Sequence, residues 1–232
     1  MPDIKIKSLE GKEFGAYCAL PAGGTGPGMI VIQEIFGVNK VMRDLCDMYA
    51  AQGYIAVCPD LFWRQQPGVQ LTDKTPAEWD RAFELYKGFD VEAGVRDLLS
   101  TLAHVRTIKG CSGKVGAVGY CLGGKLAFLM ATRSDVEAIT SFYGVELDKY
   151  LDEVHDIRMP TLIHIAALDK YVPEPVRKKL LQAFARNPAI TAYVYEGADH
   201  AFARVGGDHY NKPAADLANQ RTKDFFGKYL QG

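Results

Sequence analysis

A strand-to-helix junction near the middle of the chain constrains its fold more than any other segment. The apolar run Val115–Val118 predicts a buried parallel strand, and Leu126–Met130 predicts the apolar face of a helix that follows without a gap. Between them, Gly119-Tyr-Cys-Leu-Gly123 has the pattern Gly-x-nucleophile-x-Gly, with cysteine as the nucleophile. A sharp turn here strains the backbone of Cys121, and the flanking glycines let neighbouring chain approach without Cβ clashes.

The chemistry of such a junction suits a reactive thiol. The start of the helix lies under the sulfur of Cys121, where its N–H groups favour a thiolate. The N–H of Leu122 is placed to donate to a developing oxyanion. Two other interpretations remain open at this point: a Gly-rich turn that binds phosphate, and a tight turn that merely carries a buried cysteine. Residues elsewhere in the chain decide between them.

Composition places the chain among ordinary globular proteins. Of 232 residues, 48% are hydrophobic and 24% are charged, and the net charge is −1. This charge gives no reason to expect nucleic acid or a membrane as a partner, and no apolar stretch reaches the length of a membrane span. The five scattered cysteines predict neither a disulfide framework nor a metal site. Because Met1–Glu10 lacks an apolar signal-peptide core, we expect a protein of the reducing cytoplasm.

Strand and helix patterns alternate along the chain. Ile4–Ser8 and Phe14–Leu20 predict an antiparallel edge, Leu61–Lys74 predicts a long surface loop, and Thr75–Glu78 has the N-cap, proline and acid that begin a helix. We therefore predict an α/β fold with a mostly parallel central sheet, helices on both faces, and one domain over residues 1–232. Helical spacing continues from Thr75–Glu78 through Asp90 to Ile108. The other predicted strands are Gly28–Gln33, Tyr54–Cys58, Ala138–Tyr143, Thr161–Ala166 and Thr191–Tyr195, and the other predicted helices are Val41–Tyr49, Pro175–Arg186 and Pro213–Leu230.

An acid and a histidine follow two of the later predicted strands. In sheets of this kind the reacting groups gather beyond the carboxyl ends of the strands. Asp169 comes after the strand that ends at Ala166, and His200 comes after the strand that ends at Tyr195. The chain order of nucleophile, acid and histidine is that of an α/β-hydrolase triad. Each residue alone is a common loop residue, but together they favour a catalytic Cys121 whose proton His200 takes and returns while Asp169 orients the imidazole.

Other residues of the same types have weaker claims. His164 lies within a buried strand pattern, so we expect a hydrogen-bonded core histidine. Asp199 is expected to form a turn beside His200. Cys58 ends a strand but lacks the turn of a nucleophile, and Cys111 is expected in a loop.

Five segments together resemble the dienelactone hydrolase family, and the resemblance covers essentially the whole chain. The combination of Gln-Glu-Ile-Phe-Gly with Gly-Tyr-Cys-Leu-Gly-Gly is highly specific. It implies an α/β-hydrolase fold with Cys121, Asp169 and His200 as the triad, and no metal or organic cofactor. The segments are Gln33–Asn39, Ala56–Leu61, Val118–Gly124, Tyr143–Val145 and His200–Arg204.

The resemblance also implies roles for residues outside the triad. Glu34 matches the family's extra carboxylate near the thiol, and the N–H of Ile35 joins that of Leu122 in the oxyanion hole. Arg204 matches one of two arginines that hold a substrate carboxylate, for which a guanidinium is well suited. The sequence leaves two alternatives open, a helix-cap role for Glu34 and a solvated Arg204.

The chain departs from the family at the second arginine. Aligned from the segment that follows, this position falls on Trp79, and Arg81 lies two residues on, about 200° around a helix. The sequence leaves open whether Arg81 points into the site or whether the second contact is absent. Phe83 and Phe142 lack hydroxyl groups that lactone-cleaving members have. The aromatic residues expected around the substrate are Phe36, Trp63, Trp79, Phe83 and Tyr143.

The sequence therefore predicts a hydrolase that opens a small ester or lactone through an acyl-cysteine. We expect an anionic substrate, whose carboxylate Arg204 would hold. By resemblance, the favoured substrate is 4-carboxymethylenebut-2-en-4-olide (dienelactone), opened to maleylacetate in the degradation of chloroaromatic compounds. The alternatives are a broad carboxylesterase for other small esters, favoured if Arg81 faces solvent, and a non-catalytic thiol sensor. We expect a monomer, because no exposed apolar stripe stands out.

Overall fold

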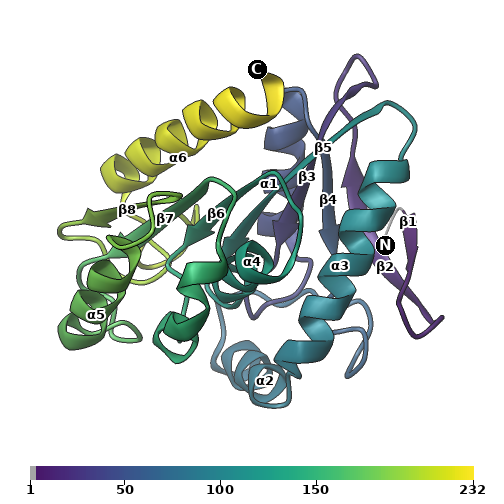
Figure 1. The fold of residues 1–232 in the computed structure, drawn as a ribbon. Helices are drawn as coiled ribbons and strands as arrows, with labels where there is room; N and C mark the ends of the chain where they lie inside the picture. The colour runs from purple at the N-terminus through teal and green to yellow at the C-terminus, as the bar shows by residue number, and fades with distance from the viewer. Residues whose placement is uncertain (1–3) are drawn as a thin grey trace. The chain divides into compact units, whose positions relative to one another are not determined.

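The computed structural model describes residues 4–232, so residues 1–3 of the N-terminal segment considered for a signal peptide lie outside it. The chain forms two compact units, one ending at Gly116 and the other beginning at Ala117. From β3 onward strands and helices alternate along the chain, as the sequence predicts (Figure 1). The strands are β1 (Ile4–Lys7), β2 (Glu13–Ala19), β3 (Gly26–Ile32), β4 (Ile55–Pro59), β5 (Cys111–Tyr120), β6 (Ala138–Phe142), β7 (Thr161–Ala166) and β8 (Ile190–Tyr195).

The first unit contains β1 to β4 and three helices. β1 pairs antiparallel with β2, β2 pairs antiparallel with β4, and β3 pairs parallel with β4. The antiparallel edge predicted at the start of the chain is therefore confirmed. The helices of this unit are α1 (Lys40–Ala51), α2 (Pro76–Lys87) and α3 (Val91–Thr107).

Helices cover both faces of the sheet in the first unit. The thiol of Cys46 on α1 hydrogen-bonds to that of Cys58 on β4, so α1 lies on the Cys58 face. Gly28, which pairs with Ile55 of β4, lies so close to α3 that a Cβ would come within 2.4 Å of Val105 Cγ1. Because side chains alternate along a strand, Ile55 and Cys58 face opposite sides, and so do the two helices.

The second unit has the same layered arrangement. β6 pairs parallel with β7, and β7 pairs parallel with β8. Ser141 Oγ donates to the Gly124 carbonyl in α4, whereas His164 Nε2 lies 2.9 Å from Thr222 Oγ1 in α6. Phe142 pairs with His164 in register, so α4 and α6 lie on opposite faces of the sheet. The helices of this unit are α4 (Leu122–Arg133), α5 (Glu174–Phe184) and α6 (Lys212–Phe226).

Local signals in the sequence locate the helix starts well. Thr75 Oγ1 accepts from the Glu78 N–H at the start of α2, as the predicted capping box requires. The helical spacing predicted through Asp90 is interrupted, because Gly88 ends α2 and the Asp90 side chain caps α3. The expectation that Cys111 lies in a loop is wrong, because β5 begins there and continues into the buried run.

Two further segments differ from the sequence-based expectations. A 3₁₀-helical segment, Leu147–Asp156, follows β6 and was not predicted. The final helix ends at Phe226, and a wider helical turn, Gly227–Gln231, completes the predicted stretch to Leu230. The prediction of one domain over residues 1–232 stays a prediction.

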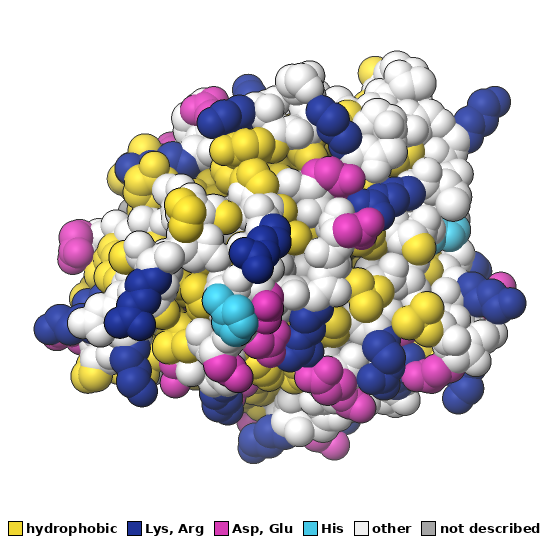
Figure 2. All heavy atoms as spheres, in the orientation of Figure 1, with side chains coloured by type: hydrophobic (Ala, Val, Ile, Leu, Met, Phe, Trp, Pro, Cys, Tyr) yellow, Lys and Arg dark blue, Asp and Glu magenta, His cyan; other side chains and the backbone are white. Residues whose placement is uncertain are grey.

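The surface carries mixed charge. On the face shown in Figure 2, basic and acidic side chains are interspersed with apolar ones, so this face has no field of a single sign. Within residues 4–232, every helix is too short or too polar to span a bilayer.

Candidate active site

Cys121 occupies the strained turn that the sequence predicts between β5 and α4. Its backbone has φ 56° and ψ −113°, a conformation that side-chain-bearing residues rarely adopt. The N–H of Cys121 donates to the Phe142 carbonyl at 3.1 Å, and its carbonyl accepts from the Lys125 N–H at 3.1 Å. A single residue therefore ends the strand and begins the helix.

Two glycines of the motif are needed for close backbone approach. A Cβ on Gly119 would lie 1.9 Å from the carbonyl oxygen of Gly123. A Cβ on Gly124 would lie 2.7 Å from the Phe142 carbonyl oxygen and 2.8 Å from Gly144 Cα. These neighbours are backbone atoms, so a larger side chain at either position would displace the turn that presents Cys121.

His200 and Asp169 form a buried hydrogen bond. His200 Nδ1 lies 2.7 Å from Asp169 Oδ2, and the other carboxylate oxygen accepts from the Tyr171 N–H at 2.8 Å. Because the carboxylate accepts at Nδ1, that nitrogen carries a proton and Nε2 is left for chemistry. The loop after β7 and the loop after β8 supply the two residues, as expected from the sequence.

The thiol and the imidazole also interact. Burial by itself lowers the pKa of His200, yet that pKa is raised well above its ordinary value. The negative charge of a Cys121 thiolate and the hydrogen bonds that the imidazolium donates to Asp169 and Cys121 favour the charged form. Cys121 and His200 are each 9% exposed, so water screens this attraction only weakly. The second unit thus brings the three predicted residues together, and their catalytic roles stay predictions.

Two tyrosines flank the His200 imidazole. The ring centroid of Tyr143 lies 5.3 Å from that of His200, and the ring of Tyr171 lies 4.8 Å away on the exposed side. Tyr143, expected at the substrate, is only 2% exposed and packs beneath the imidazole. Tyr171 was not predicted, although its place two residues after Asp169 is a signal that could have found it. Phe142 is fully buried, with its ring centroid 4.4 Å from that of His164.

The loop that carries His200 is held by its own residues. Asp199 Oδ1 accepts from the His200 N–H at 2.6 Å, the turn role expected for this aspartate. His209 Nδ1 lies 3.2 Å from the His200 carbonyl oxygen, and Ala201 has φ 63°. Arg204 donates its N–H to the Ala201 carbonyl at 2.9 Å and is half-buried. A carboxylate contact of Arg204 stays a prediction.

Glu34 and Ile35 lie in the first unit, in the loop after β3. Both side chains are buried. The neighbouring Gln33 accepts from the Leu61 N–H at 3.0 Å, which ties this loop to the end of β4. The roles expected for Glu34 and Ile35 beside the thiol stay predictions.

Three of the predicted pocket aromatics form one cluster in the first unit. The Phe36 ring meets the Trp79 ring edge-on at a centroid distance of 4.9 Å, and Trp79 stacks on Phe83 at 5.7 Å. Arg81 turns elsewhere, because its guanidinium contacts Glu84 and Gln66 Oε1. The separation of about 200° between Trp79 and Arg81 on the helix explains this difference.

Trp63 lies apart from these aromatics. Its ring stacks on that of Phe14 at a centroid distance of 5.5 Å, and its Nε1 donates to Asp97 Oδ2 at 2.8 Å. The guanidinium of Arg64 lies over the ring at 4.3 Å. The expectation that Trp63 lines the substrate site therefore receives no support from its contacts.

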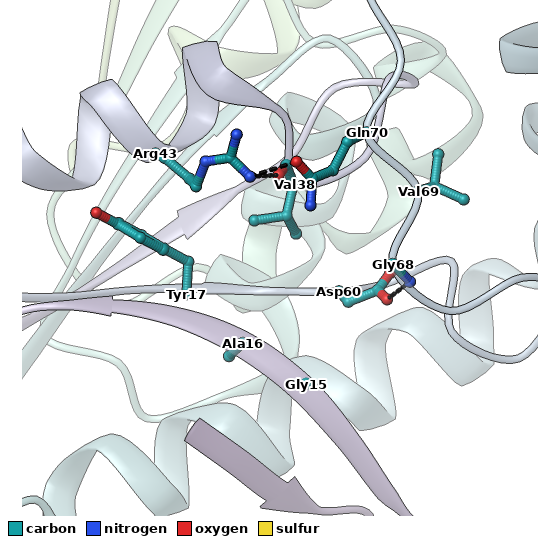
Figure 3. Close-up of a pocket in the computed structure, with 9 residues that line it drawn as sticks. All are labelled: Gly15, Ala16, Tyr17, Val38, Arg43, Asp60, Gly68, Val69 and Gln70. Atoms are coloured by element: carbon teal, nitrogen blue, oxygen red, sulfur yellow. Dashed lines mark hydrogen bonds between the residues drawn. The ribbon is translucent and has the colours of Figure 1, made fainter. Parts of the chain in front are cut away.

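The predicted surface loop Leu61–Lys74 is irregular but tethered within the first unit (Figure 3). Asp60 Oδ2 accepts from the Gly68 N–H at 2.7 Å, and Arg43 reaches both the Val38 carbonyl and the Gln70 side chain. The small cavity between these residues has a volume of about 30 Å³, which is room for about one water molecule rather than for a substrate.

Two further features concern possible metal ligands and the oxidation state of the cysteines. Between residues 4 and 232, no group of three or more His, Cys, Asp or Glu side chains is arranged to hold a metal ion. All five cysteines are free thiols.

Comparisons with known proteins agree with this geometry. The model of the dienelactone hydrolase family matches residues 14–230. A protein of Azospirillum brasilense provisionally named carboxymethylenebutenolidase is 52% identical over 99% of this chain and 100% of its own length, and the carboxymethylenebutenolidase of Pseudomonas putida is 43% identical over 96% and 94%. A crystal structure from Klebsiella pneumoniae, provisionally named dienelactone hydrolase, has a TM-score of 0.85 at 30% identity and covers 97% of both chains. The predicted α/β-hydrolase fold is confirmed.

Proposed function

Because this chain belongs to the dienelactone hydrolase family, it is a hydrolase of esters or lactones, and we propose that it opens dienelactone to maleylacetate. One observation carries the proposal: the buried 2.7 Å hydrogen bond between His200 and Asp169, with the imidazole also hydrogen-bonded to Cys121 at a strained turn. The relatives named carboxymethylenebutenolidase support the choice of an enol lactone.

The first half of the reaction forms an acyl-cysteine. Cys121 Sγ, as a thiolate, attacks the lactone carbonyl carbon, and the carbonyl electron pair moves to oxygen. When the tetrahedral intermediate collapses, the ring C–O bond breaks and the leaving enolate takes a proton from His200. An enolate is a stabilised leaving group, so this step needs little acid assistance. The enol then becomes the ketone of the product.

The second half releases the product. His200 Nε2, now neutral, accepts a proton from water while the water oxygen attacks the thioester carbon. The C–S bond breaks and a carboxylic acid leaves, which restores the thiolate and the imidazolium. The acid then ionises and releases its proton to the solvent. Asp169 stabilises the positive imidazole, while its second oxygen accepts from the Tyr171 N–H and so holds the carboxylate in place.

Residues outside the triad complete the proposal through the family resemblance. The N–H groups of Leu122, at the start of α4, and of Ile35 stabilise the oxyanion. Glu34 governs the proton of the thiol before substrate binds, and Arg204 holds the substrate carboxylate. Among the pocket residues, Phe36, Trp79 and Phe83 supply apolar contact area.

A second candidate function is a carboxylesterase for small esters without a carboxylate. The observation that favours it is the pairing of Arg81 with Glu84 and Gln66, away from the Phe36–Trp79–Phe83 cluster. With one arginine of the pair engaged elsewhere, anionic lactones lose part of their advantage over neutral esters. The chemistry at Cys121 is the same in both candidates.

Steady-state hydrolysis of cis-dienelactone, trans-dienelactone and p-nitrophenyl acetate distinguishes the candidates. The proposal predicts that kcat/KM for a dienelactone exceeds that for the neutral ester by at least about a hundredfold. Arg204→Ala should remove most of this preference, since a lost charge-assisted contact costs about 1.5–3 kcal/mol. Arg186→Ala, at an exposed arginine after α5, is the matched control and should leave the preference unchanged.

Variants of the triad test the mechanism itself. Cys121→Ala should abolish turnover, and Asp169→Asn should lower kcat by about 10³ to 10⁴-fold, because the amide favours the wrong imidazole tautomer. Preference for the neutral ester with no effect of Arg204→Ala would replace dienelactone by the carboxylesterase. Full activity of Cys121→Ala would overturn both candidates.

A further inference from the structure

Tyr171 presents an exposed aromatic ring directly beside the candidate catalytic imidazole. Its ring centroid lies 4.8 Å from that of His200 at an interplanar angle of 73°, and the residue is 40% exposed. The ring therefore contacts the imidazole in a T-shaped arrangement and is partly open to solvent, with the Lys170 Nζ 5.1 Å from its centroid. Tyr143, the other tyrosine against His200, is buried and has no such free surface.

Exposed apolar side chains gather on the two loops that hold the acid and the base. Within residues 4–232, six large apolar side chains are exposed, and three of them are Leu168, Tyr171 and Val205. Leu168 precedes Asp169, and Val205 follows Arg204 in the loop of His200. Exposed apolar groups beside a reacting centre are typical of a surface that binds an apolar ligand.

The direction of proton transfer indicates which part of a substrate would contact the apolar surface of these two loops. In the proposed reaction His200 delivers its proton to the leaving oxygen, so the alcohol portion of an ester lies on the His200 side of the carbonyl. Tyr171 lies against the same imidazole and is partly exposed, so it offers an apolar group on that side a surface to contact. Aromatic rings give large contact area with little loss of side-chain freedom.

We propose that Tyr171 determines specificity for the leaving group, and that its ring binds the apolar alcohol portion of an ester substrate. This inference rests on the proposed hydrolase function. It extends the substrate class from lactones, whose leaving group stays tethered, to esters with alkyl or aryl alcohols.

The structure allows the ring to be tested separately from the triad. Tyr171 supports Asp169 through its backbone N–H, which donates to Asp169 Oδ1 at 2.8 Å whatever the side chain. Tyr171→Ala therefore removes the ring and keeps this hydrogen bond. The side chain is partly exposed, so we expect the variant to fold normally, which its thermal midpoint checks.

Two ester series give the measurement. One series keeps the acetyl group and lengthens the alcohol from ethyl to hexyl, and the other keeps ethanol and lengthens the acyl chain from acetate to hexanoate. For the wild type we expect kcat/KM to rise about twofold per methylene of alcohol, which is part of the full burial of a methylene. Tyr171→Ala should lower kcat/KM for hexyl acetate about tenfold more than for ethyl acetate. The acyl series should shift by one common factor.

Two further variants sharpen the test. Tyr171→Phe keeps the ring and should stay within twofold of the wild type in both series. Tyr229→Ala is the matched control, because Tyr229 is a partly exposed tyrosine with a lysine Nζ 4.9 Å from its ring centroid, as Tyr171 has one at 5.1 Å. It should leave both series unchanged.

The outcomes separate this inference from the function on which it rests. If Tyr171→Ala lowers both series by the same factor, the ring acts only through the position of His200, and the specificity role is overturned. If the wild type hydrolyses dienelactone but its rates with esters are independent of the alcohol, the function stands and this inference fails. Absence of turnover of every lactone and ester overturns both.

Discussion

The two units of the chain make their tight turns with different residues. In the first unit, every described residue with positive φ is a glycine: Gly11, Gly24, Gly37, Gly53, Gly68, Gly110 and Gly113. In the second unit, Gly197 and Gly206 have positive φ as well, but so do four residues with side chains: Cys121, Tyr143, Glu146 and Ala201. Glycine reaches this conformation at little cost, whereas other residues hold it only when their surroundings force it.

This difference distinguishes turns that only change the direction of the chain from turns that position side chains at the candidate active site. Cys121 carries the thiol, Tyr143 packs against His200, and Ala201 follows His200 directly. At each of these positions the strain keeps a side chain or a neighbour in place beside the reacting groups. The first unit needs only a change of chain direction at its turns, and glycine supplies it. Backbone strain in this protein therefore marks the half that carries the proposed nucleophile, acid and base.

The largest expected effect comes from replacing the strained nucleophile by glycine. Cys121→Gly removes the thiol, so kcat/KM for any ester should fall by at least about 10⁴-fold. It also relieves the backbone, so the free energy of unfolding should rise by about 1 kcal/mol. Ester hydrolysis and urea unfolding of the same preparation measure both effects. A loss of stability would show that the turn at Cys121 is not strained.

A glycine of the first unit should behave in the opposite way. Gly37 has φ 76°, and a Cβ there would lie 2.1 Å from the Val69 carbonyl oxygen. Gly37→Ala should lower the free energy of unfolding by about 2–4 kcal/mol, from a steric clash added to backbone strain. Gly11→Ala is the matched control, because Gly11 has φ 83° with no atom within 4 Å, and it should cost only about 1 kcal/mol. If both variants lose the same free energy of unfolding, the clash with the Val69 carbonyl oxygen does not contribute to the loss.

The two units also differ in how their buried ionisable groups make the stability of the fold depend on pH. Burial lowers the pKa of His164 in the second unit to about 3, whereas burial raises the pKa of Asp60 in the first. The unfolded chain protonates His164 below about pH 6.5 and the folded protein does not, so its contribution to stability is lost as the pH falls from about 6.5 toward 3. Asp60 has the opposite sign, because its raised pKa lets the folded protein bind the proton first as the pH falls.

Urea unfolding at pH 7 and pH 5 measures the histidine effect. The stability difference between the wild type and His164→Gln should shrink by about 2 kcal/mol on going to pH 5. Taking the difference between the two proteins cancels the other titrating groups, His200 and Asp60 among them. A difference that does not change with pH would mean that the pKa of His164 is the same in the folded and unfolded chain.

The smallest expected effect is at the residue after His200. Ala201→Gly should raise the free energy of unfolding by about 0.5–1 kcal/mol, because glycine tolerates φ 63° without strain. We expect kcat to fall a few-fold, since a looser backbone holds His200 less firmly. Thermal unfolding and ester hydrolysis check the two parts, and a rise in kcat would contradict the role given to strain.

The sequence predicts the features of this protein that depend on local chemistry. The spacing of Gly119, Cys121 and Gly123 predicts the turn, because its steric demands involve only residues of the same turn and the strand beside it. Capping by Thr75 predicts the start of α2 for the same reason. The chain order of Cys121, Asp169 and His200 predicts which loops carry the reacting groups, because parallel strands end at one edge.

Some side chains have several possible partners, and only the tertiary structure decided which partner each of them contacts. Arg81 pairs with Gln66, fifteen residues earlier, Trp63 stacks on Phe14, and the ring of Tyr171 lies on His200. These contacts join residues that are distant in the chain, and their side chains have several rotamers of similar energy. Packing in the folded protein selects one rotamer, and neither a periodicity nor a motif in the sequence predicts which one. The sequence by itself determined the fold and the candidates for the reacting residues, whereas the tertiary structure decided what surrounds them.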